Sequence, residues 1–187
     1  MKMIKQTKIE TKKQKNLLLS ILCFCLALFI SGCGSSKNSA FEPEENFEIK
    51  EHGRDCTITG YRGNSMELNI PSKIGDRTVT KIGDNAFKGC TAIVNVTIPD
   101  TVKKIGKWAF AGCSSLESIT IPEGVAEIMF ATFEDCSSLQ SVTIPNSVTK
   151  IDYKAFRYCS SLKSVTIPSG AEIDSGAFDD DCIVHKK

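Results

Sequence analysis

The chain has 187 residues, of which 41% are hydrophobic and 24% charged, and this is enough for one domain with a continuous core. Its net charge of +1 conceals an uneven distribution, because six lysines and only one acidic residue fall within residues 1–32. The other 155 residues carry 17 basic and 21 acidic side chains, a net charge of −4. This composition provides no electrostatic footprint for nucleic acid, so no nucleic-acid partner is expected.

Residues 1–32 have the pattern of an export signal. Six lysines accompany a 14-residue apolar run at 17–30, which is short for a spanning helix and typical of a signal-peptide core. The run leads into Ser31, Gly32 and Cys33, which resemble a bacterial lipobox. That resemblance implies cleavage before Cys33, a lipid on its sulfur, and anchoring at the outer face of the bacterial cell membrane. An uncleaved N-terminal anchor is the alternative, and either places the remaining chain outside the membrane.

Residues 33–46 are polar and are expected to form a lipidated, flexible tether. Residues 47–81 have strand character without a strict period. Within them, residues 56–59 and 66–70 alternate apolar and polar side chains, and a glycine-containing stretch separates the two. We expect an N-terminal β-hairpin cap here, because a solenoid with an uncovered end would expose its core.

Residues 82–187 repeat one segment in four full copies and a partial fifth. The copies begin at isoleucines 23 residues apart, with a last interval of 22: Ile82, Ile105, Ile128, Ile151 and Ile173. Phenylalanine stands five positions after each start, and cysteine stands eight positions after the first four. These residues are Phe87, Phe110, Phe133, Phe156 and Phe178, then Cys90, Cys113, Cys136 and Cys159. A fixed period of this length indicates a solenoid, in which each copy buries its apolar side chains against its neighbours.

Each copy contains two recognisable pieces. The alternating residues 118–121 and their equivalents predict short strands with one buried face, and the proline that follows ends each strand. Stacking would place these strands in a parallel sheet. The short stretch around each phenylalanine, as between Gly106 and Gly112, predicts a brief α or 3₁₀ turn, since too few residues are available for a full helix.

The combined pattern Ile-Gly-x-x-Ala-Phe-x-x-Cys-x-x-Leu-x-x-Ile-Thr-Ile-Pro, as at 105–122, resembles the BspA-like leucine-rich repeat family of surface proteins. The resemblance covers roughly residues 58–187. It implies a leucine-rich-repeat solenoid and a role in adhesion, and it brings no catalytic residue and no cofactor. The third copy departs from the pattern, with Met129 and Phe130 where glycine is usual and Thr132 in place of alanine.

The cysteines of the repeats form a column that Cys182 extends by one period. An exported compartment would permit disulfides among them. Equivalent side chains in a stack point the same way, however, which favours buried free thiols. A disulfide within a subset of the column stays an alternative, whereas metal binding lacks Cys-x-x-Cys spacing or histidine partners.

No motif for catalysis stands out. His52 and His185 lie near opposite ends of the predicted domain, and neither a phosphate-binding glycine loop nor a His-Glu-x-x-His motif is present. The acidic run 179–181 could hold calcium, but three consecutive acidic residues are more often a solvated edge. We therefore expect no enzymatic activity, no cofactor and no metal site.

Two sets of side chains are candidates for contact with a partner. One is a row of threonines on the outward face of the strands, where threonine is also an ordinary strand former: Thr97, Thr120, Thr143 and Thr166. The other is a rim of large side chains at positions where polar residues or glycine are usual: Trp108, Met129, Phe130, Tyr153 and Tyr158. Aromatic residues and methionine are enriched in interface cores, but packing beneath an adjacent loop is an alternative for this rim.

These patterns together predict a non-catalytic, lipid-anchored extracellular recognition domain. Its repeat surface would bind a protein or glycan partner, as in adhesion, and the lipid would bind the membrane. The alternative is a structural protein of the cell envelope that acts by self-association.

Overall fold

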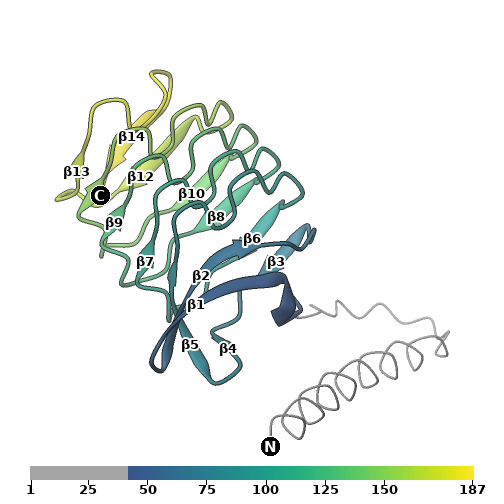
Figure 1. The fold of residues 1–187 in the computed structure, drawn as a ribbon. Coiled ribbons are helices and arrows are strands. Elements are labelled where there is room, and N and C mark those ends of the chain that lie inside the picture. The colour runs from purple at the N-terminus through teal and green to yellow at the C-terminus, as the bar shows by residue number, and fades with distance from the viewer. Residues whose placement is uncertain (1–41) are drawn as a thin grey trace, which may run out of the picture. The chain divides into compact units, whose positions relative to one another are not determined.

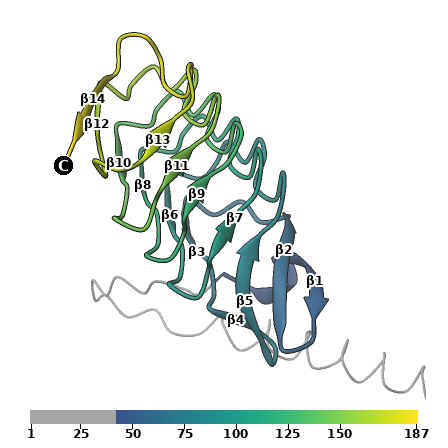
Figure 2. The ribbon, with the colours of Figure 1, turned by 90° about the vertical axis from the view of Figure 1, so that its left-hand side faces the viewer.

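The structure is a computed structural model that describes residues 42–187, which form a stack of short coils (Figures 1 and 2). This confirms the predicted repeat solenoid with short parallel strands. The predicted signal peptide, Cys33 and most of the predicted tether lie outside the described residues. Within 42–187, no helical segment combines the length and the apolar character that crossing a bilayer requires.

A β-hairpin lies at the N-terminal end of the stack. After a 3₁₀ turn (Glu44–Asn46), β1 (Phe47–His52) and β2 (Asp55–Tyr61) pair antiparallel. Strand β2 then pairs in parallel with β5 (Arg77–Ile82), which also takes β4 (Lys73–Ile74) as an antiparallel neighbour. The hairpin therefore continues the stack and covers its first coil (Figure 2).

The strand at 66–70 differs from the expected arrangement. It does not pair with 56–59; instead β3 (Glu67–Asn69) lies parallel to β6 (Asn95–Thr97), with Leu68 opposite Val96. The physical reason is present in the sequence, because Ile70 and Pro71 repeat the Ile-Pro pair that also stands at 98–99, 121–122, 144–145 and 167–168. The segment therefore stacks as the strand of a coil, and the hairpin uses residues 47–52 instead.

Two parallel ladders run along the stack. The first has the order β10-β8-β6-β3, with β8 (Ser118–Thr120) and β10 (Ser141–Thr143) paired at the 23-residue period. The second has the order β13-β11-β9, in which β11 (Lys150–Ile151) pairs in parallel with β9 (Glu127–Ile128) and β13 (Glu172–Ile173). The equivalent strand of the second copy, β7 (Lys104–Ile105), pairs in parallel with β5. At the C-terminal end, β12 (Ser164–Ile167) pairs in parallel with β14 (Ile183–Lys186).

The segment around each phenylalanine is a run of tight turns, and the predicted α or 3₁₀ turn is wrong in this detail. Backbone N–H groups alternate between two kinds of partner. Phe87 donates to Ala109 of the next coil at 2.8 Å, whereas Lys88 donates to Asn85, three residues earlier, at 3.1 Å. Left-handed residues within the run break a continuous helix. Every second N–H is thereby free to join neighbouring coils, so the turns form a third ladder.

The core of the stack contains a continuous column of aromatic rings. The five repeat phenylalanines lie nearly parallel, with centroids 5.0–5.5 Å apart and interplanar angles of 3–10°. Tyr61 and Phe47 extend the column into the N-terminal hairpin at 5.4 Å each. Four of these rings, from Phe87 to Phe156, are fully buried. The repeat therefore places each phenylalanine over its counterpart, as the period predicts.

The cysteine column lies beside the phenylalanine column, and all six described cysteines are free. The thiols of Cys113, Cys136 and Cys159 each donate a hydrogen bond to a phenylalanine carbonyl one coil earlier, at 3.2 Å. Burial raises the pKa of the Cys113 thiol to about 12. The Cys113 thiol therefore stays protonated, and the buried thiols of the column act as small hydrogen-bonding core residues.

Candidate partner-binding groove

The turns contain two backbone positions that adopt a left-handed conformation. One lies three residues after the start of each copy and the other seven residues after it. Their φ angles lie between 53° and 73° at Asn85, Trp108, Ala131 and Lys154, and at Gly89, Gly112, Asp135 and Tyr158. Glycine, asparagine and aspartate tolerate this conformation, which costs other residues roughly 1–2 kcal/mol.

Trp108 and Tyr158 are therefore unexpected where they stand. Their φ angles are 53° and 62°. The position of Trp108 carries Asn85, Ala131 and Lys154 in other copies, and that of Tyr158 carries Gly89, Gly112 and Asp135, so no other copy has an aromatic side chain at either place. A bulky side chain at positive φ is uncommon and persists only where the surroundings or a function maintain it. Folding alone would favour the residues found in the sister copies. The two aromatic side chains therefore mark this surface as a candidate site.

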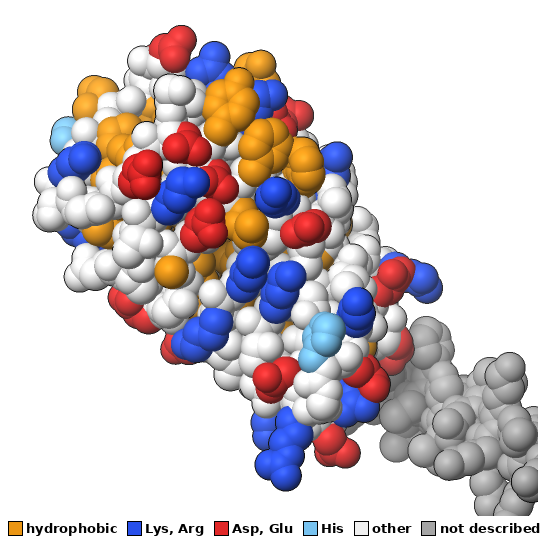
Figure 3. All heavy atoms as spheres, turned by 60° about the vertical axis from the view of Figure 1, so that its left-hand side comes forward, with side chains coloured by type: hydrophobic (Ala, Val, Ile, Leu, Met, Phe, Trp, Pro, Cys, Tyr) orange, Lys and Arg blue, Asp and Glu red, His pale blue; other side chains and the backbone are white. Residues whose placement is uncertain are grey.

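Both aromatic side chains line the same open groove on the turn surface, which we call the turn-face groove. Its volume is about 450 Å³, and the residues that line it are Lys88, Gly89, Trp108, Ala111, Gly112, Glu134, Asp135 and Tyr158. Gly89, Ala111 and Gly112 contribute almost no side-chain bulk, which keeps the surface between the aromatic rings low. Figure 3 shows hydrophobic side chains gathered in a row on one face of the molecule, with charged side chains of both signs beside them.

The structure brings together only part of the rim that the sequence suggests. Trp108 packs edge-on against Phe130 with ring centroids 4.9 Å apart, and Phe130 lies 6.0 Å from Tyr153. Tyr158 is 55% exposed and shares the groove with Trp108. Met129 is separate and lines another hollow of about 140 Å³, together with Lys103, Lys104, Ala126 and Glu127.

The threonine row lies on a different part of the solenoid. Three of its members belong to β6, β8 and β10 of the first ladder and the fourth to β12, and all four side chains are exposed: Thr97, Thr120, Thr143 and Thr166. The row is flat and polar, and none of the four threonines lines the two hollows described above. The turn-face groove is therefore the more structured of the two candidate surfaces.

Charges of both signs surround the groove. The Lys154 ammonium lies 3.3 Å from a carboxylate oxygen of Glu134, and this hydrogen bond raises the pKa of Lys154. The ammonium of Lys88 lies 5.9 Å from the centroid of the Trp108 ring, near the outer limit of a cation–π contact. Asp135 is exposed beside Glu134 and has no ion-pair partner among residues 42–187. The charged side chains at the groove thus balance.

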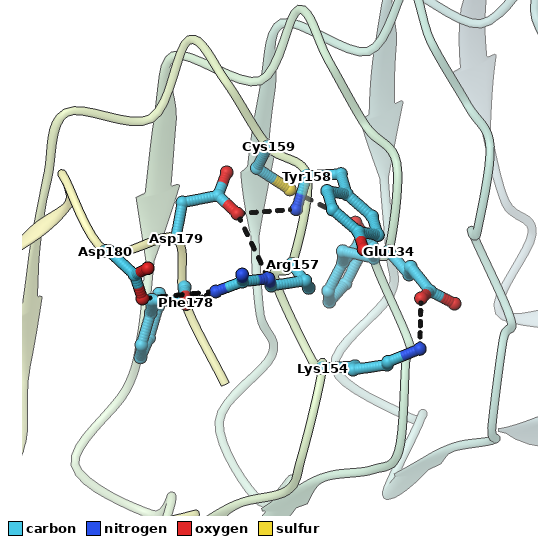
Figure 4. Close-up of polar contacts among 9 residues, drawn as sticks. Glu134, Lys154, Arg157, Tyr158, Cys159, Phe178, Asp179 and Asp180 are labelled. Carbon is cyan, nitrogen blue, oxygen red and sulfur yellow. Dashed lines mark hydrogen bonds and ion pairs between the residues drawn. The ribbon is translucent and has the colours of Figure 1, made fainter. Parts of the chain in front are cut away.

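The last copy holds Tyr158 in place (Figure 4). The Tyr158 backbone N–H donates to an Asp179 carboxylate oxygen at 2.8 Å, and the Arg157 guanidinium lies 5.6 Å from the Tyr158 ring centroid. Arg157 also donates to Asp180 at 3.3 Å, and Lys163 donates to Asp181 at 2.6 Å. The acidic run 179–181 is thus occupied by protein donors. Across residues 42–187, no group of three or more histidine, cysteine, aspartate or glutamate side chains could hold a metal ion.

The composition of the groove is suited to binding. Its lining contains no histidine, cysteine or serine, so it lacks the Ser-His and Cys-His pairs of acyl-transfer sites. The sequence analysis did not identify Lys88, Glu134 or Asp135 as site residues. A signal for them was present in the column Gly89, Gly112, Asp135, since these residue types favour left-handed turns and so predict a tight, exposed bend.

Comparisons with known proteins agree on the type of repeat. The family described as "BspA type Leucine rich repeat region" matches residues 64–184 in six copies, and the match therefore includes β3. Curated proteins gave no match.

Two crystal structures resemble the chain well. A leucine-rich repeat protein of T. pallidum is 33% identical with a TM-score of 0.71, over 76% of this chain and 68% of that one. A leucine-rich repeat protein of Bacteroides ovatus is 31% identical with a TM-score of 0.67, over 75% of this chain and 39% of that one. The chain thus spans about two thirds of the first protein and well under half of the second.

Proposed function

We propose a recognition function for this chain, which belongs to the BspA-type leucine-rich repeat family. In this proposal the domain binds a protein or glycan partner through the turn-face groove and performs no chemistry. Leucine-rich repeats suggest a protein-interaction or surface role in general, and the groove supplies a specific place for it. The partner would contact Trp108 and Tyr158, the two aromatic side chains that line the groove.

One observation carries the proposal: aromatic side chains occupy backbone positions that disfavour them, and they line an open groove. A side chain retained against its own backbone preference indicates selection for something other than folding. The ladders on each side of the turns also make the groove rigid before binding. Docking would therefore lose little conformational entropy, which favours affinity.

The test replaces Trp108 with the residue that the first copy carries at the same position. Trp108→Asn copies Asn85, which adopts a φ of 60° there, so the backbone should accept the change. We expect the full chain to lose most binding to whichever partner it captures on arrays of extracellular proteins and glycans. Tyr153, an exposed aromatic side chain outside the groove, provides the control as Tyr153→Ala. Retained binding by Trp108→Asn would overturn the proposal.

Anchoring at the outer face of the cell membrane belongs to the same proposal. It is supported by the lysine-rich start, the apolar run and the Ser-Gly-Cys ending at Cys33. A single acyl chain holds a protein only weakly, whereas two or more anchor it stably. Cells fed an alkyne fatty acid should label the wild-type protein and not Cys33→Ala, and equal labelling of both would refute lipidation at this residue.

Self-association is a second candidate, and the C-terminal end of the stack favours it. Strand β14 pairs with β12 only, and its Ile183 side chain is 61% exposed. An exposed strand edge with an apolar side chain is a template for pairing with another chain. Light scattering across a concentration series separates the candidates, since a pure recognition domain stays monomeric and Ile183→Lys should abolish any concentration-dependent growth in size.

A further inference from the structure

We propose that the turn-face groove binds a neutral oligosaccharide, with sugar rings stacked on Trp108 and Tyr158 and hydroxyl groups donating to Glu134 and Asp135. The inference rests on the proposed recognition function and specifies the chemical class of the partner. Three features of the groove support it: its backbone groups, its charge balance and the separation of its aromatic rings.

The backbone N–H groups of the groove are unavailable to a peptide. The N–H groups of Gly89, Gly112 and Asp135 already donate to carbonyls of the following coil at 2.8–2.9 Å, and that of Tyr158 donates to Asp179. A peptide that extends a sheet needs free main-chain donors and acceptors at its edge. Recognition in this groove must therefore come from side chains, which suits a ligand without a repeating backbone of amides.

The charges at the groove disfavour a charged ligand. The lining carries one cation, Lys88, and two anions, Glu134 and Asp135, and Glu134 is already paired with the neighbouring Lys154 at 3.3 Å. A polyanion or a basic peptide would gain attraction from one sign and repulsion from the other. The core of a protein interface is also depleted in charged residues, whereas three of the eight residues that line this groove are charged.

A sugar ring matches the groups of the groove that are still available, namely two aromatic side chains and two carboxylates. Its C–H face is apolar and packs on an aromatic face, while its hydroxyl groups are donors for carboxylates such as Glu134 and Asp135. Trp108 stands three residues after the start of the second copy and Tyr158 seven residues after the start of the fourth. Coil stacking therefore separates them by two strand spacings, roughly 10 Å, along the stack, and their different places in the turn add a sideways offset. Two aromatic rings set this far apart suit an oligosaccharide rather than a single sugar. The groove volume of about 450 Å³ is that of a small-molecule site.

Trp108 is the only tryptophan of the chain, so its fluorescence reports directly on the groove. The full chain, held in a detergent without a sugar head group, is titrated with cellohexaose, maltohexaose, mannohexaose and chitohexaose. A heparin hexasaccharide and a basic hexapeptide serve as charged comparisons. Titration to about 10 mM would detect even a ligand of millimolar Kd. Tyr158→Asn tests the second ring, Glu134→Gln tests a hydroxyl acceptor, and Tyr153→Ala is the matched control outside the groove.

We expect at least one neutral hexasaccharide to change the Trp108 fluorescence saturably. Tyr158→Asn should raise its Kd about tenfold or more, Glu134→Gln should raise it less, and Tyr153→Ala should leave it within about twofold. The inference is overturned if no neutral sugar changes the signal, if only heparin or the peptide does, or if Tyr153→Ala weakens binding as much as Tyr158→Asn. If the arrays meanwhile yield a protein partner that Trp108→Asn releases, only the sugar assignment fails and the recognition function stands.

Discussion

Phe133, in the middle of the phenylalanine column, gives the sharpest test of the stacked core. It is fully buried and stacks on Phe110 at 5.5 Å and on Phe156 at 5.2 Å. Replacing a buried phenylalanine by alanine costs about 3–5 kcal/mol, and each aromatic pair contributes about 0.5–1.5 kcal/mol beyond its buried area. Phe133→Ala should therefore lower the free energy of unfolding by about 4 kcal/mol, a large part of the stability of an ordinary domain.

Phe178 provides the internal comparison because it ends the column and stacks on Phe156 alone, at 5.1 Å. With one ring partner fewer, Phe178→Ala should be less damaging than Phe133→Ala by about 0.5–1.5 kcal/mol. Phe133→Leu keeps most of the volume and should cost less than about 1.5 kcal/mol. Urea unfolding of residues 40–187, followed by far-ultraviolet circular dichroism, measures all three. The reasoning is refuted if Phe133→Ala costs no more than Phe178→Ala.

The thiols and one carboxylate give two further predictions. Burial raises the pKa of Cys113 to about 12. A hydrogen bond to the neighbouring Cys159 thiol, together with burial, raises the pKa of Cys136. Cys90 and Cys182 are only half-buried. Iodoacetamide at about pH 8 should therefore modify Cys90 and Cys182 well before the other two, and equal rates by peptide mass spectrometry would contradict the buried column. Burial raises the pKa of Glu42, but three side-chain hydrogen bonds outweigh it and leave that pKa lowered. Its carboxylate thus adds stability above the unfolded-state pKa and loses it as the pH falls through the lower folded value, so Glu42→Gln should destabilise the fold in urea at about pH 7 and hardly at about pH 3.

The repeating part of the fold could be predicted because a fixed period forces its register. Once Phe110 and Phe133 are equivalent, stacked coils leave each ring only one neighbour above and one below. The Ile-Pro endings fix the strands in the same way. The same signal at Ile70 was missed because residues 66–70 lie outside the strict period, and their strand was therefore assigned to the hairpin rather than to a coil.

The turns and the groove were harder to predict, for a physical reason. Alternating apolar and polar residues report which face is buried, but they do not report a positive φ. Trp108 and Tyr158 stand at left-handed positions that only their sister residues Asn85 and Gly112 reveal. The groove combines Trp108 from the second copy, Glu134 and Asp135 from the third and Tyr158 from the fourth. No single copy of the repeat therefore contains the information that predicts it.

The most direct test of the groove combines Trp108→Asn and Tyr158→Asn in one protein and measures its stability and binding together. Asparagine tolerates the left-handed backbone, which offsets the lost ring contact between Trp108 and Phe130. The free energy of unfolding should therefore stay within about 1 kcal/mol of the parent, while affinity for the partner found on the arrays falls about tenfold or more. A variant that unfolds more easily by several kcal/mol, or that binds as tightly as the parent, would show that the two aromatic residues serve the fold and not recognition.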